Sequence, residues 1–373
     1  MDARVLIFLT WLLAGTAAVA QPANTLDAPV TRQPGGAAVN LPAPLDAVAA
    51  AQLREQALDV LTDLAQRGEP QVRANALEGL ALVPTRLEPV IRRALVDENP
   101  GVRAVAAMAA GKARLASVAE FVRPLLNDPS NLVRASAIVG LSQIAMSPAG
   151  RSARIELPDP SPLARMLWSR DPREQGQAAF ALGEIGNTSA LPMLREAVRQ
   201  PMPRAGANEK RIVQLQMNEA MAKMGDDTVL GEIRAALYPS SPADLEVAAL
   251  AAQVVGQVGD KQSILQLDYL CQPRNTSGRT GGAAPDEGQM PAEVRLAAAA
   301  AIGKLGDPMG IPTATEFLTS PSPAYRAAAA LAIGEAGRVS TLSLALLQPV
   351  INDPEPSVQA AAAAGIIKAT DGR

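Results

Sequence analysis

The chain has 373 residues, more than the roughly 100 to 200 of a typical single domain, so it contains either several domains or one array of repeats. Hydrophobic residues make up 48% but aromatic residues only 2%, which excludes a compact core built around large rings. The net charge of −3 argues against binding along a nucleic-acid backbone, and the absence of histidine excludes Ser-His-Asp catalysis, Cys-His catalysis and histidine-bound metal sites.

Residues 1–20 predict an export signal. A short charged start with Arg4 precedes an apolar stretch, and the small-residue tripeptide Ala18-Val19-Ala20 is typical of a cleavage site. The alternative is an uncleaved anchor, but the stretch of about 16 apolar residues is shorter than the roughly 20 that span a bilayer. We therefore expect a periplasmic or secreted protein with no membrane span after signal cleavage.

Residues 21–44 are rich in Pro, Ala and Gly and have no apolar periodicity, which predicts a disordered linker. From residue 45 to residue 373 the chain repeats a motif of the form V-R-x-x-A-x-x-small-L-x-x-hydrophobic-G. The motif begins at nine positions: Val72, Val102, Val133, Glu174, Val213, Val247, Val294, Tyr325 and Val358.

The apolar positions of each motif lie on one stripe of an α-helix, and two of these columns hold mostly Ala or Gly, which lets backbones approach closely. Five motifs end in a glycine that favours a left-handed helix terminus: Gly186, Gly225, Gly259, Gly306 and Gly337. A second apolar segment follows each motif, as in 87–96 and 342–351, so each unit is a helical hairpin. Because no hairpin can bury its stripe alone, the units must stack into an open solenoid with local contacts only.

The spacing between motifs varies from 30 to 47 residues because three intervals contain inserts. The longest insert, 272–291, is polar and rich in glycine, as expected of a mobile surface loop. Such a loop can carry binding function, although a tolerated insertion is the simpler interpretation.

The units resemble HEAT repeats, especially the short type named after phycobilisome lyases. The resemblance implies an all-α solenoid of about nine HEAT-like hairpins that forms a right-handed superhelix. It also implies a structural ladder in which an Asp in a turn and an Arg of the following helix connect stacked units. The pattern matches as Asp97 with Arg103 and as Asp128 with Arg134. Three arginines lack the preceding aspartate: Arg73, Arg295 and Arg326.

Known enzymes on this scaffold include bilin lyases and deoxyhypusine hydroxylase. The hydroxylase binds iron through His-Glu motifs, and this chain has no histidine to carry them over. A lyase-like enzyme or an accessory subunit of an enzyme complex is the alternative function, although an exported protein is poorly placed for bilin attachment. We predict no catalytic, cofactor-binding or metal-binding residue, and we expect Cys271 to be a buried, inert thiol.

The tenth position after each motif start is polar in eight of nine units. The resemblance implies that this helix lines the concave side of the solenoid, where the column would face a partner protein. At the sixth position after each motif start the larger side chains cluster in the early units, so we expect the first six repeats to hold the partner site. A solvated helix face is the alternative interpretation. The predicted binding residues are Lys112, Gln143, Glu184, Lys223, Gln257, Lys304 and Glu335. The sequence thus predicts a non-enzymatic scaffold without cofactor whose partner is another protein.

Overall fold

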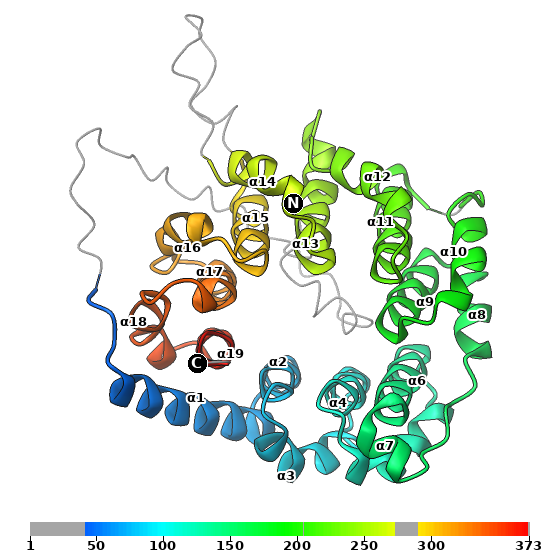
Figure 1. The fold of residues 1–373 in the computed structure, drawn as a ribbon, viewed down its shortest axis with the longest axis horizontal. Helices are drawn as coiled ribbons and strands as arrows, with labels where there is room; N and C mark the ends of the chain where they lie inside the picture. Colours follow the sequence, from blue (N-terminus) through cyan, green and yellow to red (C-terminus); the bar gives the residue numbers. More distant parts are fainter. Residues whose placement is uncertain (1–41, 204, 273–289, 372–373) are drawn as a thin grey trace, which may run out of the picture.

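The computed structural model describes residues 42–203, 205–272 and 290–371, which form nineteen α-helices and no β-strand. The predicted export signal (1–20), nearly all of the predicted linker (21–44) and most of the insert 272–291 lie outside the described residues. Within them the predicted all-α solenoid of HEAT-like hairpins is confirmed (Figure 1).

Nine helices form an inner layer, and each carries one of the nine motifs (Figure 1). They are α2 (Pro70–Leu80), α4 (Pro100–Lys112), α6 (Asn131–Met146), α9 (Pro172–Ile185), α11 (Ala207–Lys223), α13 (Leu245–Val258), α15 (Ala292–Lys304), α17 (Pro323–Glu335) and α19 (Pro356–Thr370).

Shorter helices, apart from the 21-residue α1, form an outer layer (Figure 1). They are α1 (Ala47–Arg67), α3 (Pro84–Ala94), α5 (Ala119–Val122), α7 (Pro148–Ser152), α8 (Ser161–Leu167), α10 (Leu191–Ala197), α12 (Leu230–Ala235), α14 (Ile264–Cys271), α16 (Ile311–Glu316) and α18 (Ser343–Leu347). Short 3-10 helices extend or connect these elements: η1 (Ala116–Val118), η2 (Arg123–Asn127), η3 (Thr188–Ala190), η4 (Asp227–Val229), η5 (Pro242–Asp244), η6 (Lys261–Ser263), η7 (Pro308–Gly310), η8 (Ala336–Arg338) and η9 (Val350–Asn352).

The solenoid closes into a ring. Each inner helix packs against the next along the chain, and α19 then packs against both α1 and α2, so the last unit meets the first (Figure 1). Arg54 Nη1 donates to Thr370 Oγ1 at 2.6 Å across this seam. The expectation of an open solenoid with local contacts only is therefore wrong. Nine units close a circle when each turns by about 40° relative to the last, a small rotation for stacked repeats.

Close contacts between inner helices depend on the small residues of the motif. A Cβ built on Gly111 would lie 2.6 Å from Gly140 Cα, and one built on Gly334 would lie 2.3 Å from Gly365 Cα. At these two contacts the helix backbones meet without intervening side chains. The aliphatic core, exemplified by the fully buried Leu80 and Leu141, lies farther along the same stripes.

The helix ends follow the sequence for local reasons. Four of the five predicted glycines have left-handed φ angles between 70° and 89° after an inner helix: Gly186, Gly225, Gly259 and Gly306. The prediction is wrong for Gly337, because α17 continues directly into η8 there. None of the described helices is both long and apolar enough to cross a membrane.

Candidate binding site

The predicted binding residues lie near the C-terminal ends of seven inner helices, α4 to α17, and the structure brings five of them into contact with neighbouring helices. Lys223 of α11 forms an ion pair with Glu184 of α9 at 2.8 Å. Gln143 Nε2 donates to the backbone oxygen of Glu184 at 3.1 Å. Glu335 lies 4.0 Å from Lys304. These residues therefore connect inner helices to one another.

The other two predicted residues, Lys112 and Gln257, are exposed and make no hydrogen bond or ion pair with another described residue. Sequence reasoning left out three charged residues that complete the same surface. Lys368 pairs with Glu335 at 2.5 Å, and Glu219 pairs with Lys223 at 2.7 Å. The third is Glu78 of α2. Lys368 stands in the motif column of the predicted residues, and Glu78 and Glu219 stand at the sixth position after their motif starts, so the position in the motif was the signal available.

Four lysines and four glutamates thus form an inner charge cluster: Glu78, Lys112, Glu184, Glu219, Lys223, Lys304, Glu335 and Lys368. Glu78 interacts electrostatically with Lys304, although α19 and α17 separate their helices in the ring. Lys304 in turn interacts with Glu219 of α11. Side chains from separate arcs of the ring therefore converge on its interior.

Burial affects the titration of this cluster unevenly. It raises the pKa of Glu78, and the nearby Lys112 and Lys368 only partly oppose it. Burial likewise lowers the pKa of Lys304 despite the attraction of Glu335. For Glu335 burial opposes ionisation as well, but Lys368 and Lys304 outweigh it and lower its pKa. Equal numbers of both charges, largely paired internally, leave little net field to attract a charged partner.

The arginine ladder exists, but its pairing differs from the prediction. Arg73 donates to both carboxylate oxygens of Asp97, and Arg103 to both oxygens of Asp128, so each arginine reaches the aspartate of the next unit. Toward its own turn Arg103 donates to backbone oxygens, that of Asp97 at 2.8 Å and that of Glu98 at 3.1 Å, and not to the Asp97 carboxylate. Arg134 does the same with the backbone oxygen of Asp128. The side-chain pairs Asp97 with Arg103 and Asp128 with Arg134 are thus wrong.

The last repeats contain the same type of arginine–carboxylate contact between units. Arg326 donates to both oxygens of Asp353 at 2.8 and 2.9 Å, and these hydrogen bonds lower the pKa of Asp353. Arg295 instead pairs with Glu316 at 2.7 Å. Because these contacts are bidentate or half-buried, we assign them to fixing the rotation between units and not to chemistry.

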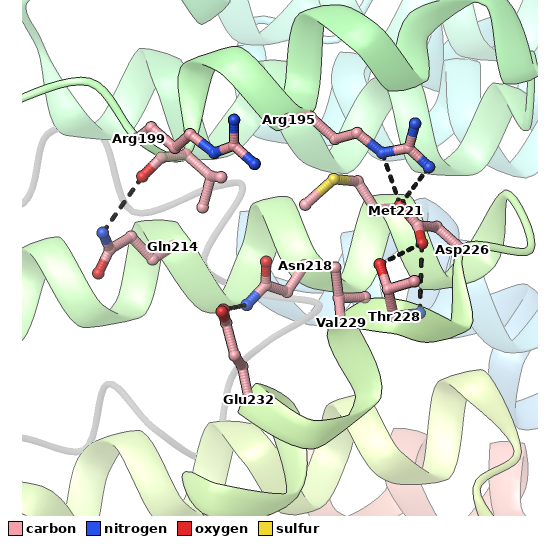
Figure 2. Close-up of a pocket in the computed structure, with 10 residues that line it drawn as sticks. Arg195, Arg199, Gln214, Asn218, Met221, Asp226, Thr228, Val229 and Glu232 are labelled. Atoms are coloured by element: carbon pink, nitrogen blue, oxygen red, sulfur yellow. Dashed lines mark hydrogen bonds and ion pairs between the residues drawn. The ribbon is translucent and has the colours of Figure 1, made fainter.

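A pocket of about 620 Å³ lies between the outer helices α10 and α12, above the inner helix α11 (Figure 2). It forms at one of the inserted intervals, since α10 ends at Ala197 and α11 begins only at Ala207. Its lining combines charged, amide and apolar side chains: Arg195, Val198, Arg199, Gln214, Asn218, Met221, Asp226, Thr228, Val229 and Glu232.

Asn218 is the unusual member of this pocket. It is 4% exposed, its Nδ2 donates to Glu232 Oε2 at 2.8 Å, and its Oδ1 has no donor among the described residues. Figure 2 shows this oxygen directed away from Glu232, toward the side of the pocket formed by α10. A buried acceptor without a donor costs about 1–3 kcal/mol.

Sequence reasoning missed Asn218, although its column carried a signal. The fifth position after each motif start is apolar in the eight other units and buried in all of them: Leu77, Ala107, Ile138, Ala179, Ala252, Ala299, Ala330 and Ala363. Asparagine is the single polar exception in an otherwise apolar column. A polar residue held at a core position at a cost in stability marks a candidate site.

The charged groups of the pocket are arranged asymmetrically. Arg195 pairs with Asp226 at 2.8 Å, and hydrogen bonds from Thr228, then from Arg195, lower the pKa of Asp226. Arg199 is exposed and has no acidic partner in the described part of the chain. The wall formed by α10 and the turn after it therefore offers an unpaired guanidinium, whereas the floor holds a buried acceptor without a donor (Figure 2).

The outer surface holds most of the few aromatic side chains. Seven aromatic residues lie in the described ranges, none of them is buried, and four are at least 43% exposed: Phe121, Trp168, Tyr238 and Tyr269. All four belong to outer helices or the residues directly after them. Leu265 of α14 is 81% exposed, and Gln266 donates to the backbone oxygen of Leu237, which places α14 beside the end of α12. We call Tyr238, Leu265 and Tyr269 the outer apolar patch.

The predicted inert thiol is confirmed as buried: Cys271 is 1% exposed, and burial raises its pKa to about 12. No group of three or more Cys, Asp or Glu side chains suited to a metal ion occurs among the residues with described positions. The described residues thus form a closed helical-repeat ring, and the pocket between α10, α11 and α12 is a candidate ligand site on its outer side.

Comparison with known families agrees with this class of protein. The family described as HEAT repeats matches residues 52–142 and 287–367, and the PBS lyase HEAT-like repeat matches residues 174–200. The chain is a HEAT-repeat protein with repeats of the phycobilisome-lyase type. No curated protein sequence matches the chain.

Several solved structures are similar at low identity. Human deoxyhypusine hydroxylase in complex with glycerol is 17% identical over 86% of this chain and 98% of that chain, with a TM-score of 0.33. The complex of CpcE and CpcF of phycocyanin lyase from Nostoc sp. PCC7120 is 17% identical over 83% and 100%, with a TM-score of 0.38. An engineered protein is 18% identical over 87% and 95%, with a TM-score of 0.32. Likeness at this level carries no conclusion about activity or ligands.

Proposed function

We propose that the chain is a non-enzymatic protein-binding scaffold of the periplasm or the extracellular space. The observation that carries this proposal is the position of the seven described aromatic residues: none is buried, and four are exposed on the outer helices or just after them. Exposed aromatic side chains are typical anchors of protein interfaces. The ring closed by α19 provides a scaffold of fixed shape for such anchors.

This proposal moves the binding surface from the inner face to the outer face. The inner charge cluster is largely paired within the ring, so a partner binding there would have to replace existing ion pairs. Within the outer apolar patch, Tyr238 and Leu265 present apolar surface directly to a partner, because Tyr238 is 64% exposed and Leu265 is 81% exposed. Burying these side chains against a partner would release ordered water and favour association.

The location is proposed from residues 1–20 alone, whose charged start, apolar stretch and Ala18-Val19-Ala20 ending are typical of an export signal. Cell fractionation followed by N-terminal sequencing tests it. We expect the chain in the envelope or the medium, beginning at Gln21. A cytoplasmic chain that still begins at Met1 would refute this location.

The binding proposal is tested by affinity capture of the tagged chain from envelope extracts, followed by mass spectrometry. The test variant replaces Tyr238, Leu265 and Tyr269 with serine, and the matched control replaces three exposed residues elsewhere: Val48, Met309 and Val339. We expect one or two proteins that survive a salt wash, are lost with the test variant and are retained by the control. Equal recovery with both variants would exclude the outer apolar patch as the docking surface.

A further inference from the structure

The pocket between α10, α11 and α12 has features that packing alone does not require. Asn218 occupies a column in which the eight other units bury an apolar residue, and its Oδ1 has no donor among the described residues. Inner helices of this ring pack well with alanine at this position, as Ala179 and Ala252 show. The amide therefore points to a ligand that supplies the missing donor.

The walls of the pocket specify what else the ligand carries. Arg199 presents an exposed guanidinium with no acidic partner in the described residues, and guanidinium groups bind carboxylates in bidentate geometry. Gln214 uses its Nε2 to bond the backbone oxygen of Val198 at 3.3 Å, which leaves its Oε1 as a further acceptor. A suitable ligand thus has a carboxylate for Arg199 and N–H groups for Asn218 and Gln214 (Figure 2).

We propose that this pocket binds an extended peptide segment that carries a carboxylate. The carboxylate pairs with Arg199, and a backbone N–H donates to Asn218 Oδ1. Extended peptide backbone supplies the donors in series, and a pocket of about 620 Å³ is in the range that holds a small ligand or a few residues. The inference rests on the proposed scaffold function, because it names the chemistry of the partner segment.

Two features of the pocket disfavour other anions. Asp226 already neutralises Arg195, and Glu232 lies on the opposite side, so a ligand with several negative charges would face carboxylates as well as Arg199. A single carboxylate next to amide donors meets no such repulsion. Because Asn218 Oδ1 exposes almost no surface, its donor reaches it only when a neighbouring side chain shifts, and the flexible Met221 of the lining can do so.

The test measures binding of three acetylated tetrapeptides to the purified chain by titration calorimetry and saturation-transfer NMR. The first is tetra-alanine with a free carboxylate, the second is its C-terminal amide, and the third is that amide with glutamate at the third position. We expect a carboxylate peptide to bind about tenfold tighter than the plain amide, as for a charge-assisted hydrogen bond. Comparing the first and third peptides distinguishes a chain terminus from an acidic side chain.

In Arg199→Gln the carboxylate peptides and the plain amide should bind with about equal affinity. Arg173→Gln, on the exposed surface of α9, should keep the preference for the carboxylate unchanged. Asn218→Ala should weaken all three peptides. Because Asn218 is buried, its substitution can also unfold the ring, so the exposed Arg199 carries the test by itself. No binding of any peptide at millimolar concentration, or an unchanged preference in Arg199→Gln, would overturn the proposal.

The same variants separate this inference from the scaffold proposal. If envelope proteins are captured equally by the wild-type chain and by Arg199→Gln, the pocket is not their docking site, while the scaffold function stands. If the peptides bind as expected but no envelope protein is captured, the peptide site stands and the scaffold function fails.

Discussion

At the scale of single residues, the inner charge cluster contains carboxyls whose titration is shifted in opposite directions. Burial raises the pKa of Glu78 above 4.5, so the folded ring favours its protonated form. The resulting contribution to stability is fully present below about pH 4.5 and is lost as the pH rises through the raised pKa of the folded state. Glu78→Gln keeps a neutral group there at every pH. We expect it to raise the melting temperature at pH 8 by about 1–2 °C and to have no effect near pH 4.

Glu335→Gln is the matched control for Glu78→Gln, because Lys368 and Lys304 overcome the effect of burial and lower the pKa of Glu335. Its ionised form stabilises the ring above about pH 4.5, and this contribution is lost as the pH falls through the lowered pKa of the folded state. Glu335→Gln should therefore lower the melting temperature at pH 8. If both variants lowered the melting temperature at pH 8 by the same amount, the two carboxyls would have the same environment, and this result would contradict the structure.

Cys271 gives a second prediction at this scale. Its thiol is buried and its pKa is raised to about 12, so almost no thiolate exists at pH 8. Alkylation by iodoacetamide at pH 8 should be at least about a hundredfold slower in the folded chain than in guanidinium chloride. Mass spectrometry of timed samples measures both rates. Comparable rates would mean that α14 opens readily or that the thiol is accessible.

At the scale of helices, the packing of α4 against α6 depends on a glycine. A Cβ added to Gly140 would lie 2.2 Å from the backbone oxygen of Ala107, which cannot move without shifting α4. Gly140→Ala should therefore cost about 1–3 kcal/mol of stability. The control is Gly231→Ala in α12, where an added Cβ meets nothing within 4 Å and helix propensity predicts a gain of about 0.5–1 kcal/mol. Urea denaturation of both variants measures the two effects, and equal midpoints would contradict the close contact.

Much of the structure at the scale of helices could be predicted from the sequence, because each motif lies within a single helix. The spacing of Val102 and Val133 placed α4 and α6, and Gly186 marked the end of α9. The ladder pairing could not be predicted in the same way. Arg103 has one aspartate six residues before it and another 25 residues after it, and only the rotation between units decides which carboxylate its side chain reaches.

At the scale of the whole molecule, neither the ring closure nor the pocket could be predicted from the sequence, because both depend on how the units are arranged relative to one another. Closure depends on a small rotation summed over nine units, while the seam uses the same small residues as every other contact, such as Gly79 against Ala364. The pocket depends on how far the interval between α10 and α11 separates two outer helices. Asn218 was visible as a column exception, but only the structure shows that its oxygen has no donor.

Ring closure changes the expected effect of destabilising substitutions in the terminal units. In an open solenoid the terminal units contact one neighbour each, so a change there frays one end and leaves the rest folded. In this ring α19 is packed against α1 and α2 as well as α17, so a defect at the seam removes contacts from both ends at once. The seam is therefore the position where the shape of the whole molecule is most sensitive to a single residue.

Ala364 tests this directly, because it is buried in α19 and a Cβ on Gly79 of α2 would lie 3.1 Å from its own Cβ. Ala364→Arg places a long charged side chain in that contact and should open the ring. Small-angle X-ray scattering should then show a larger radius of gyration and a broader distance distribution, together with a lower melting temperature. Ala235→Arg, at an exposed position of α12, should change neither quantity. A folded Ala364→Arg chain with the wild-type scattering profile would mean that the first and last units do not hold the ring closed in solution.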